Sequence, residues 1–352
     1  MKKYKIGLVG CGNISDIYIE NLNRRFPNTE LYALCNRTRQ KAINSAEKYG
    51  IPYVMEFYEM LECREIDVVL LLTLPESHYE LAKQALEYGK HVYMEKPMGL
   101  CPAQAEDLAM TAKKKGLLLG CAPDTYLGAA VQTVKKFIEQ GDLGDIVGGS
   151  AFVACRGHEN WHPSPVFFYK RGGGPMLDMG PYYLTALVYL CGKVDCVAGM
   201  TSRTFENRTI TSQPFAGEKI EVEVETHIAG VMRLKNGGII NVMTSFDVCN
   251  TTLPFIEIYG TKGSLKLPCP NNFSGELLFS PLGTKEYQKI EILPEYWQYQ
   301  DNCRGLGLSV LLKEMDRTGN VPVENAEIAE HVLKVMCAFE ESSKTQSFIT
   351  IQ

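Results

Sequence analysis

Residues 5–15 read KIGLVGCGNIS, a short apolar run that ends in a glycine-rich turn. The turn matches the pattern G-x-G-x-x-G/A, with Ser15 in the last place. In this pattern Gly10 permits a tight turn, and Gly12 lets the backbone approach a pyrophosphate at a helix N-terminus. An amphipathic stretch, Ile14–Phe26, follows, so the turn stands between a strand and a helix, as dinucleotide binding requires. The expected cofactor contacts in this loop are Gly10, Gly12, Asn13 and Ile14.

Strand and helix patterns alternate over the first third of the chain. Near-continuous apolar runs such as IDVVLLLT, residues 66–73, are typical of strands buried on both faces of a parallel sheet. Helical patterns over residues 39–49, 78–88 and 102–115 separate these strands. Repeated βαβ units of this kind predict an α/β Rossmann domain with a doubly wound sheet over residues 1–122.

The pattern changes after residue 122. One helix is expected over residues 128–140, and alternating strand patterns with short turns then dominate. A helix over about 175–190 interrupts them, and a final helix covers about 325–343. Residues 123–352 are therefore expected to form an α+β domain with a large, mostly antiparallel open sheet that binds substrate and forms oligomers. This division leaves open whether the final helix packs on the second domain or back against the first.

The composition excludes several classes of protein. A net charge of −5 argues against a nucleic-acid partner, because such proteins usually carry a basic face. No run approaches the roughly 18 apolar residues that span a bilayer, so we expect a cytoplasmic protein without a membrane partner. The 12 cysteines are scattered from Cys11 to Cys337, with no CxxC pair and no zinc spacing. We therefore expect reduced thiols and no metal.

The end of the second strand carries Asn36-Arg37-Thr38, where an NAD-preferring site usually places Asp or Glu. A carboxylate would repel the 2′-phosphate of NADP, whereas Arg37 would pair with it and Asn36 and Thr38 would donate hydrogen bonds. The same residues also fit an ordinary helix start, with Asn36 or Thr38 as N-cap and Arg37 in solvent. That alternative is compatible with either cofactor. We expect NADP in preference to NAD, with these three residues at its adenosine end.

Two further segments end strands of the same sheet. TLPESH, Thr73–His78, completes the run IDVVLLLT, and Glu95-Lys96-Pro97 follows the strand HVYM. Because the carboxyl ends of parallel strands face the ligand crevice, both segments are expected to border the cofactor. A surface pair of Lys96 with Glu95 is the simpler alternative. The expected cofactor contacts here are Thr73, Leu74, Pro75, His78, Glu95 and Lys96.

In this order and spacing, the glycine loop, TLPESH and EKP resemble the Gfo/Idh/MocA family, which includes glucose–fructose oxidoreductase and inositol dehydrogenase. The resemblance covers essentially the whole chain and continues through GDLGDI, GGGPMLDMGPYY and RGLG. It implies an NAD(P)-dependent dehydrogenase or reductase. The enzyme would transfer hydride between nicotinamide C4 and a hydroxyl-bearing carbon of a polyol: a sugar, sugar derivative or cyclitol. It also implies a cis Lys96–Pro97 bond, a positioning role for Glu95, and a homodimer or homotetramer formed through the second sheet.

The resemblance makes Lys96 the principal catalytic candidate, because the lysine of this motif points at the reacting carbon and its hydroxyl. The chemistry agrees, since oxidation of an alcohol requires its proton to leave and the reverse reaction requires a donor to the oxyanion. A partly buried lysine beside an oxidised nicotinamide has its charged form disfavoured. The pKa of Lys96 is therefore expected to fall toward the working pH.

Many members of the family carry a D-x-x-x-H pair in GGGPMLDMGPYY, with the histidine as general acid or base. Here Asp178 is retained and Tyr182 takes the histidine's place, as in glucose–fructose oxidoreductase and dimeric dihydrodiol dehydrogenase. Residues four apart share one face of a helix, so both side chains can enter one pocket. We expect Lys96 and Tyr182 to share the substrate hydroxyl proton while Asp178 orients substrate and lysine. Ordinary helix packing of Tyr182 is the alternative.

The loop RGHENWH, residues 156–162, mixes aromatic and polar side chains, and FFYKR follows it at 167–171. Such a mixture suits a polyol, whose ring faces stack while its hydroxyls need hydrogen-bond partners. His158 and His162 lack a convincing third ligand for a metal, and loop structure alone is the other interpretation. The expected substrate contacts are Lys96, Asp124 at the domain junction, Trp161, His162, Asp178 and Tyr182.

Two other classes of function fit this fold. An NAD-dependent glycosidase-type enzyme holds its cofactor tightly and oxidises and re-reduces the sugar transiently, so net NAD(P)H formation would exclude it. A non-catalytic, dinucleotide-sensing regulator is the second class. The intact lysine of EKP and the Asp178/Tyr182 pair argue against that regulator.

Overall fold

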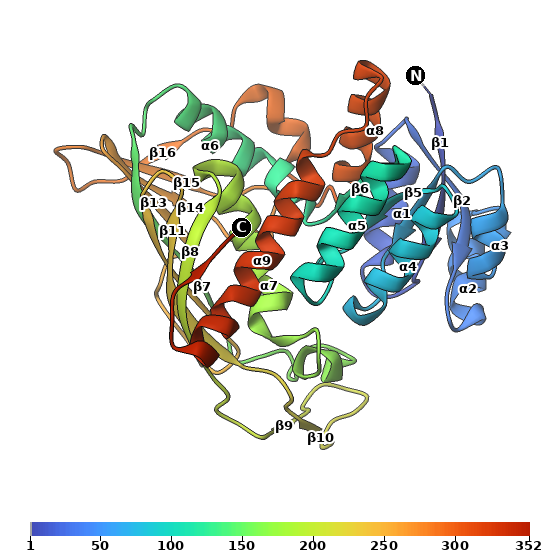
Figure 1. The fold of residues 1–352 in the computed structure, drawn as a ribbon, viewed down its shortest axis with the longest axis horizontal. Coiled ribbons are helices and arrows are strands. Elements are labelled where there is room, and N and C mark those ends of the chain that lie inside the picture. Colours follow the sequence, from blue (N-terminus) through green and yellow to red (C-terminus); the bar gives the residue numbers. More distant parts are fainter. Residues whose placement is uncertain (1) are drawn as a thin grey trace. The chain divides into compact units, whose positions relative to one another are not determined.

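The structure, a computed structural model, describes residues 2–352 and divides the chain into two compact units (Figure 1). The first unit holds the residues up to Leu127 together with Asn302–Glu330. The second unit holds Gly128–Asp301 together with His331–Gln352. The first unit thus extends past the expected boundary at residue 122 and also includes a segment from near the C-terminus. The assignment of substrate binding and oligomer formation to the second part of the chain stays a prediction.

The first unit is built on a six-stranded parallel sheet with the strand order β3-β2-β1-β4-β5-β6. The order reverses between β1 and β4, which pair with each other, so the doubly wound Rossmann sheet expected from the sequence is confirmed. β4 is buried along its whole length, as its apolar sequence predicts. The strands are β1 (Tyr4–Val9), β2 (Thr29–Cys35), β3 (Tyr53–Val54), β4 (Val68–Leu71), β5 (His91–Met94) and β6 (Leu119–Cys121).

Helices join the strands of the first unit. Proline in the first turn starts α4 and α5, because its fixed φ suits a helix and its missing N–H would be unpaired there in any case. Helix α8 and the short η1 were not among those expected; α8 packs on β6 and η1. The helices are α1 (Ser15–Arg24), α2 (Arg39–Tyr49), α3 (Phe57–Glu62), α4 (Pro75–Glu87), α5 (Pro102–Lys115), η1 (Asp124–Leu127) and α8 (Leu306–Thr318).

The second unit is built on a nine-stranded sheet with the order β16-β15-β14-β13-β7-β12-β11-β8-β17. Its neighbouring strands are antiparallel except β7 and β12, which run parallel, so the mostly antiparallel sheet is confirmed. β9 and β10 form a separate two-stranded hairpin. The strands are β7 (Ile146–Ala154), β8 (Val194–Ser202), β9 (Asn207–Thr209), β10 (Lys219–Glu221), β11 (His227–Leu234), β12 (Ile239–Ser245), β13 (Ile256–Gly260), β14 (Gly263–Leu267), β15 (Leu277–Pro281), β16 (Gln288–Ile290) and β17 (Ile349–Thr350).

Helix α7 packs on β7, β11 and β12 and is largely buried, which explains why it is apolar on nearly every side. Helix α9 belongs to the first unit up to Glu330 and to the second unit after it. Among residues 2–352 no helix is long and apolar enough to cross a membrane. The remaining helices are α6 (Ala129–Glu139), η2 (Pro165–Tyr169), α7 (Gly174–Cys191), η3 (Pro294–Tyr299) and α9 (Glu324–Thr345).

Candidate active site

The glycine loop leaves β1 in a conformation that requires glycine at one position and offers open space at another. Gly10 has φ +106°, and a Cβ there would lie 2.7 Å from the carbonyl oxygen of Leu72. A Cβ at Gly12 would meet nothing within 4 Å. The buried Ser15 closes the turn, because its hydroxyl donates to the Gly12 carbonyl oxygen at 2.6 Å. The open space at Gly12 fits the pyrophosphate that the sequence motif predicts.

The end of β2 is tied to this loop by Asn36. Its Oδ1 accepts a hydrogen bond from the Cys11 N–H at 2.9 Å, and its Nδ2 donates to the Thr38 carbonyl oxygen at 3.0 Å. Thr38 is the N-cap residue of α2 but makes no side-chain cap hydrogen bond. The side-chain N-cap considered for Asn36 or Thr38 is therefore absent.

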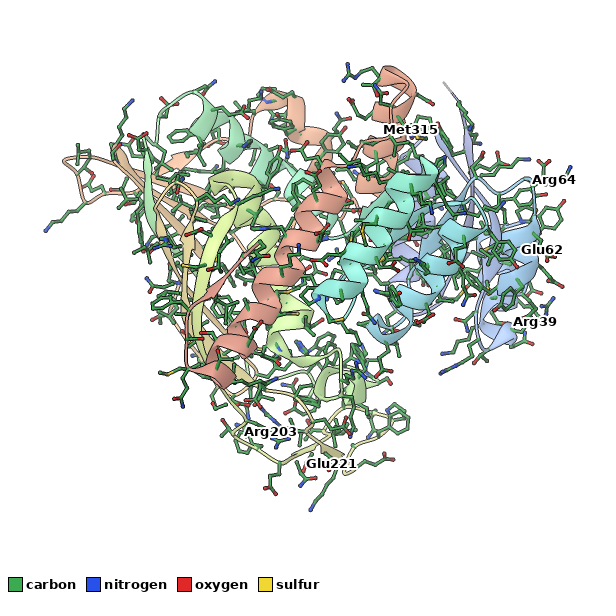
Figure 2. The ribbon with its side chains drawn as sticks, in the orientation of Figure 1. Arg39, Glu62, Arg64, Arg203, Glu221 and Met315 are labelled. Carbon is green, nitrogen blue, oxygen red and sulfur yellow. The ribbon has the colours of Figure 1, made fainter. Side chains whose placement is uncertain are left out.

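The exposed Arg37 makes no ion pair with any residue of 2–352. Arg39, which is labelled in Figure 2, pairs with Glu56 at 2.6 Å. No carboxylate occupies positions 36–38. The adenosine end of the expected site therefore carries a free guanidinium and no acidic group.

His78 joins the TLPESH and EKP segments inside the first unit. Its Nδ1 lies 2.8 Å from the Pro97 carbonyl oxygen and its Nε2 lies 2.9 Å from that of Thr73. The imidazole is fully buried, and burial lowers its pKa, although two carbonyl acceptors favour the protonated ring. Both ring nitrogens are thus used within the protein. His78 braces the two segments, and a direct contact with the cofactor stays a prediction.

Glu95 holds the backbone of Lys96 at the carboxyl end of β5. Its Oε1 accepts a hydrogen bond from the Tyr18 hydroxyl at 2.8 Å, and its Oε2 accepts from the Lys96 N–H at 3.0 Å. Tyr18 is fully buried, so desolvation and the neighbouring carboxylate of Glu95 raise its pKa well above the usual value. The Lys96–Pro97 peptide is cis, as the resemblance implied.

Asp124 is buried and accepts hydrogen bonds from the Tyr93 hydroxyl and the Gly305 N–H. A Cβ at Gly307 would lie 2.5 Å from its Oδ1, so the start of α8 sits directly on this carboxylate. Burial raises the pKa of Asp124 to about 6. The carboxylate anchors α8 within the first unit. The expected contact of Asp124 with substrate stays a prediction.

In the second unit, α7 carries Asp178 and, one turn later, the buried Tyr182. Asp178 Oδ2 lies 3.3 Å from His158 Nε2, with both side chains mostly buried. Trp161 Nε1 donates to His158 Nδ1 at 3.2 Å, and the other ring nitrogen, Nε2, is the one that faces Asp178. His158 was not among the expected site residues. Local sequence patterns do not predict a contact between residues 158 and 178. The absence of a histidine at position 182 was the one signal that a histidine from elsewhere could approach Asp178.

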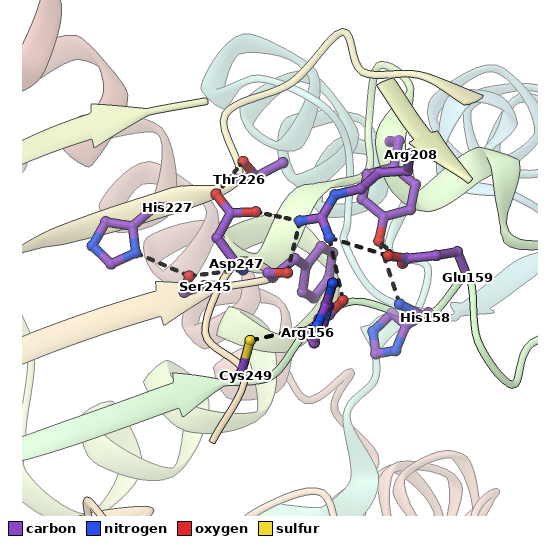
Figure 3. A network of polar contacts seen from close by, with 11 residues as sticks. Arg156, His158, Glu159, Arg208, Thr226, His227, Ser245, Asp247 and Cys249 are labelled. Atoms are coloured by element: carbon purple, nitrogen blue, oxygen red, sulfur yellow. Dashed lines mark hydrogen bonds and ion pairs between the residues drawn. The ribbon is translucent and has the colours of Figure 1, made fainter. Parts of the chain in front are cut away.

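A buried network of charged groups supports the loop that carries His158 (Figure 3). Arg208, on β9, lies 3.1 Å from Glu159 and also pairs with Asp247, and all three side chains are almost fully buried. Tyr169 donates to the other carboxylate oxygen of Glu159, and Thr226 donates to Asp247 at 2.7 Å. The guanidinium therefore joins the β9–β10 hairpin to the loop after β7 and to the end of β12.

The other expected residues of this loop differ in exposure. Trp161 is exposed, with 62% of its surface accessible. His162 is partly buried, which lowers its pKa, and its Nδ1 accepts from the Ser164 N–H at 3.0 Å. No group of three His, Cys, Asp or Glu side chains suited to a metal ion occurs in residues 2–352. Lys96 lies in the first unit and Asp178 and Tyr182 in the second, and their meeting around substrate is a proposal.

Comparisons with known proteins match both parts of the chain to one family. Residues 4–122 match the model described as oxidoreductase family, NAD-binding Rossmann fold, and residues 131–266 match the GFO/IDH/MocA C-terminal domain. The D-glucoside 3-dehydrogenase of Escherichia coli (strain K12) is 31% identical over 251 residues, which are 69% of this chain and 70% of that protein. The chain belongs to the GFO/IDH/MocA family. It is an NAD(P)-dependent oxidoreductase.

Other known proteins match this chain over most of their length. The myo-inositol 2-dehydrogenase of Thermotoga maritima is 24% identical over 262 residues, which are 74% of each chain. Levoglucosan dehydrogenase in complex with NADH and L-sorbose superposes with a TM-score of 0.84 at 19% identity, covering 100% of both chains. At that identity the structural match shows that the two proteins share a fold.

Proposed function

We propose that this GFO/IDH/MocA protein transfers hydride between nicotinamide C4 and a hydroxyl-bearing carbon of a sugar, a sugar derivative or a cyclitol. Its membership of an NAD-binding oxidoreductase family supports the type of reaction. The activities named for its relatives, a D-glucoside 3-dehydrogenase and a myo-inositol 2-dehydrogenase, support a carbohydrate or cyclitol substrate.

The observation that carries this proposal is the support of Lys96 at the carboxyl edge of the first sheet. The Tyr18 hydroxyl holds Glu95, and Glu95 holds the Lys96 N–H, so the lysine extends from a fixed backbone. β1 and its glycine loop end at the same edge, because the strands are parallel. Hydride transfer needs donor and acceptor held in fixed geometry, and this arrangement supplies such a frame.

In this proposal, side chains from both units transfer the proton of the substrate hydroxyl. Lys96 and Tyr182 share the hydroxyl proton that oxidation releases, and they return it in the reverse reaction. Asp178, which His158 supports at 3.3 Å, orients the substrate and the lysine. The bound nicotinamide supplies the hydride acceptor or donor. Trp161 and His162 are proposed as further substrate contacts, since the same loop carries His158.

The test of the proposed reaction is absorbance at the reduced-nicotinamide band across a panel of sugars and cyclitols, with NAD and NADP in parallel. Steady formation of NAD(P)H with at least one polyol is the expected result. No change with any of them would contradict the proposal. Such a result would favour a glycosidase-type enzyme with a retained cofactor, or a dinucleotide-sensing regulator.

NADP is the proposed preferred cofactor, because Arg37 is exposed and has no acidic partner in residues 2–352. Arg37→Ala is expected to raise the KM for NADPH about tenfold or more and to leave that for NADH nearly unchanged, because only NADPH carries the phosphate. Arg39→Ala is the matched control, since that guanidinium already pairs with Glu56. Equal changes for both cofactors would contradict the role of Arg37.

A further inference from the structure

An open hollow of about 500 Å³ lies in the second unit, where the loop after β7 faces the segment before β13. Three of its lining side chains are large, apolar and exposed: Trp161 at 62%, Leu253 at 46% and Phe255 at 48%. Exposed aromatic and aliphatic groups gathered around one hollow are a feature of ligand sites.

The indole of Trp161 is held in place by its neighbours. Its Nε1 donates to His158 Nδ1 at 3.2 Å, and its ring meets those of His158 and His162 edge-on, with centroids 5.3 Å away in each case. An indole that is fixed but exposed offers a flat face without a large entropy cost on binding. The C–H face of a sugar ring is a suitable partner for such a face.

The rest of the lining supplies hydrogen-bonding groups and no carboxylate. The Arg156 guanidinium makes only a weak contact with Cys249 Sγ at 3.7 Å and no ion pair among the residues that the structure describes. Asn160, Asn250 and Thr251 add amide and hydroxyl groups. Donors and acceptors on one side and an indole on the other match a ring that is apolar on its faces and rich in hydroxyls at its edge.

His158 connects this hollow to Asp178. Its ring lines the hollow, and its Nε2 lies 3.3 Å from the Asp178 carboxylate. The proposed function places the reacting ring beside Asp178, so a group attached to that ring would extend past His158 toward Trp161. The Arg208 network behind the loop keeps the hollow formed without a ligand.

We propose that the hollow is a subsite for a second sugar ring, linked glycosidically to the ring that reacts, so that the preferred substrates are glycosides of two or more sugars. This inference rests on the proposed function for the position of the reacting ring. It assigns to Arg156 and Trp161 the recognition of the second ring, the first by hydrogen bonds to hydroxyls and the second by stacking.

A kinetic test compares kcat/KM for disaccharides (maltose, cellobiose and sucrose) with that for methyl glucosides. In Trp161→Ala the ratio of the two values is expected to fall about tenfold or more, because the stacking face is lost. Trp297→Ala is the matched control: that indole is also exposed, at 60%, but bonds to the Ile292 carbonyl oxygen at 3.0 Å and does not line the hollow. An unchanged ratio in Trp161→Ala would overturn the subsite.

A binding test separates this inference from the proposed reaction. The chain has two tryptophans, so Trp297→Phe leaves Trp161 as the sole indole reporter. A saturable fluorescence change with a disaccharide, and none with methyl glucoside at the same concentration, is the expected result. Such binding of disaccharide without any turnover would support the subsite and contradict the proposed reaction. Turnover of methyl glucosides with no fluorescence change on adding disaccharide would keep the reaction and overturn the subsite.

The alternative to a sugar ring is that a second copy of the chain fills this hollow. Sedimentation velocity of wild type and Trp161→Ala distinguishes the two. The same sedimentation coefficient is expected for both, and a smaller value for the variant would show a chain–chain contact and overturn the subsite.

Discussion

At the scale of single residues, Asp178 and its partner show how one substitution changes a site. The position four residues after Asp178 carries tyrosine instead of the family's histidine, yet the structure brings a histidine to the same carboxylate from another element. His158 Nδ1 accepts from Trp161, while Nε2 lies 3.3 Å from the Asp178 carboxylate and makes no hydrogen bond within residues 2–352. We propose that His158 positions Asp178, and that Lys96 and Tyr182 are the groups that exchange the proton.

Lys96→Ala and Tyr182→Phe are each expected to lower kcat about 10²- to 10⁴-fold, because each removes a group proposed to exchange the substrate proton. Single-turnover and steady-state measurements with the best polyol from the panel provide the check. Lys83→Ala is a control on a neighbouring helix, since that lysine pairs with Asp107 and is outside the proposed site. If both variants kept turnover within a few-fold of wild type, the proton scheme would be wrong.

Asp124 provides a prediction about pH. Burial raises its folded-state pKa to about 6 from the usual value of 3.8, so the folded chain binds this proton more tightly than the unfolded chain does. Its contribution to stability is therefore fully present below the unfolded pKa and is lost as the pH rises from about 4 to about 6.

The size of this contribution is on the order of 3 kcal/mol if the whole shift is expressed. Urea unfolding at several pH values would measure it as the difference between wild type and Asp124→Asn, because asparagine keeps the shape but does not titrate. A difference that stays constant over this range would refute the assignment.

At the scale of secondary-structure elements, the sequence predicted helix α7 with nearly its observed bounds, whereas it did not predict helix α8. An apolar stretch of this length reads as a buried helix from sequence alone, even with Pro181 inside it, and the structure places α7 on three strands. α8 begins at a glycine with φ +97° that is held by the distant Asp124. Its start thus depends on a contact between segments far apart in the chain.

The Arg208 network provides a prediction at this scale, because it joins the β9–β10 hairpin to the site loop. Arg208→Ala leaves Glu159 and Asp247 buried without a cation, and is expected to lower the free energy of unfolding by about 3–5 kcal/mol. It should also raise the KM for substrate, since Glu159 follows His158 directly. Urea denaturation and steady-state kinetics measure the two effects.

Arg233→Ala is the matched control for this change. That arginine also pairs with an aspartate, Asp195 at 2.5 Å, but the pair is exposed, so little loss of stability is expected. Equal losses of unfolding free energy in Arg208→Ala and Arg233→Ala would mean that burial does not strengthen the contribution of the network to stability.

At the scale of the whole molecule, the sheet of the second unit has one covered face and one open face. α7 and α9 pack on one side, where a Cβ at Gly199 would meet Phe339. On the other side Met200, Ala229, Met243 and Phe152 stand opposite one another on β8, β11, β12 and β7. Met200 is 79% exposed and the other three are half-buried, so within residues 2–352 this row is an apolar band that other elements leave partly open. We propose that it forms the homodimer or homotetramer contact expected from the resemblance.

Met200→Glu is expected to shift the protein to a smaller species, because a dimer contact would bury the added charge. Sedimentation velocity over a range of protein concentrations measures the change. Met110→Glu, at another exposed methionine on α5 of the first unit, should leave the sedimentation coefficient unchanged. An unaltered oligomer in Met200→Glu would contradict this use of the open face.

Features that depend on neighbours along the chain were predictable from the sequence. Apolar runs, glycine at a turn of positive φ, and the strand ends that carry Thr73 and Lys96 are local patterns, so the Rossmann fold and the candidate cofactor loop followed from them. Features that depend on distant partners appeared only in the folded chain. These are the docking of α8 on Asp124, the parallel pairing of β7 with β12, and the contact of His158 with Asp178. The physical reason is that burial, ion pairing and strand pairing act between side chains and strands that the fold brings together, and local periodicity carries no information about which distant segments will meet.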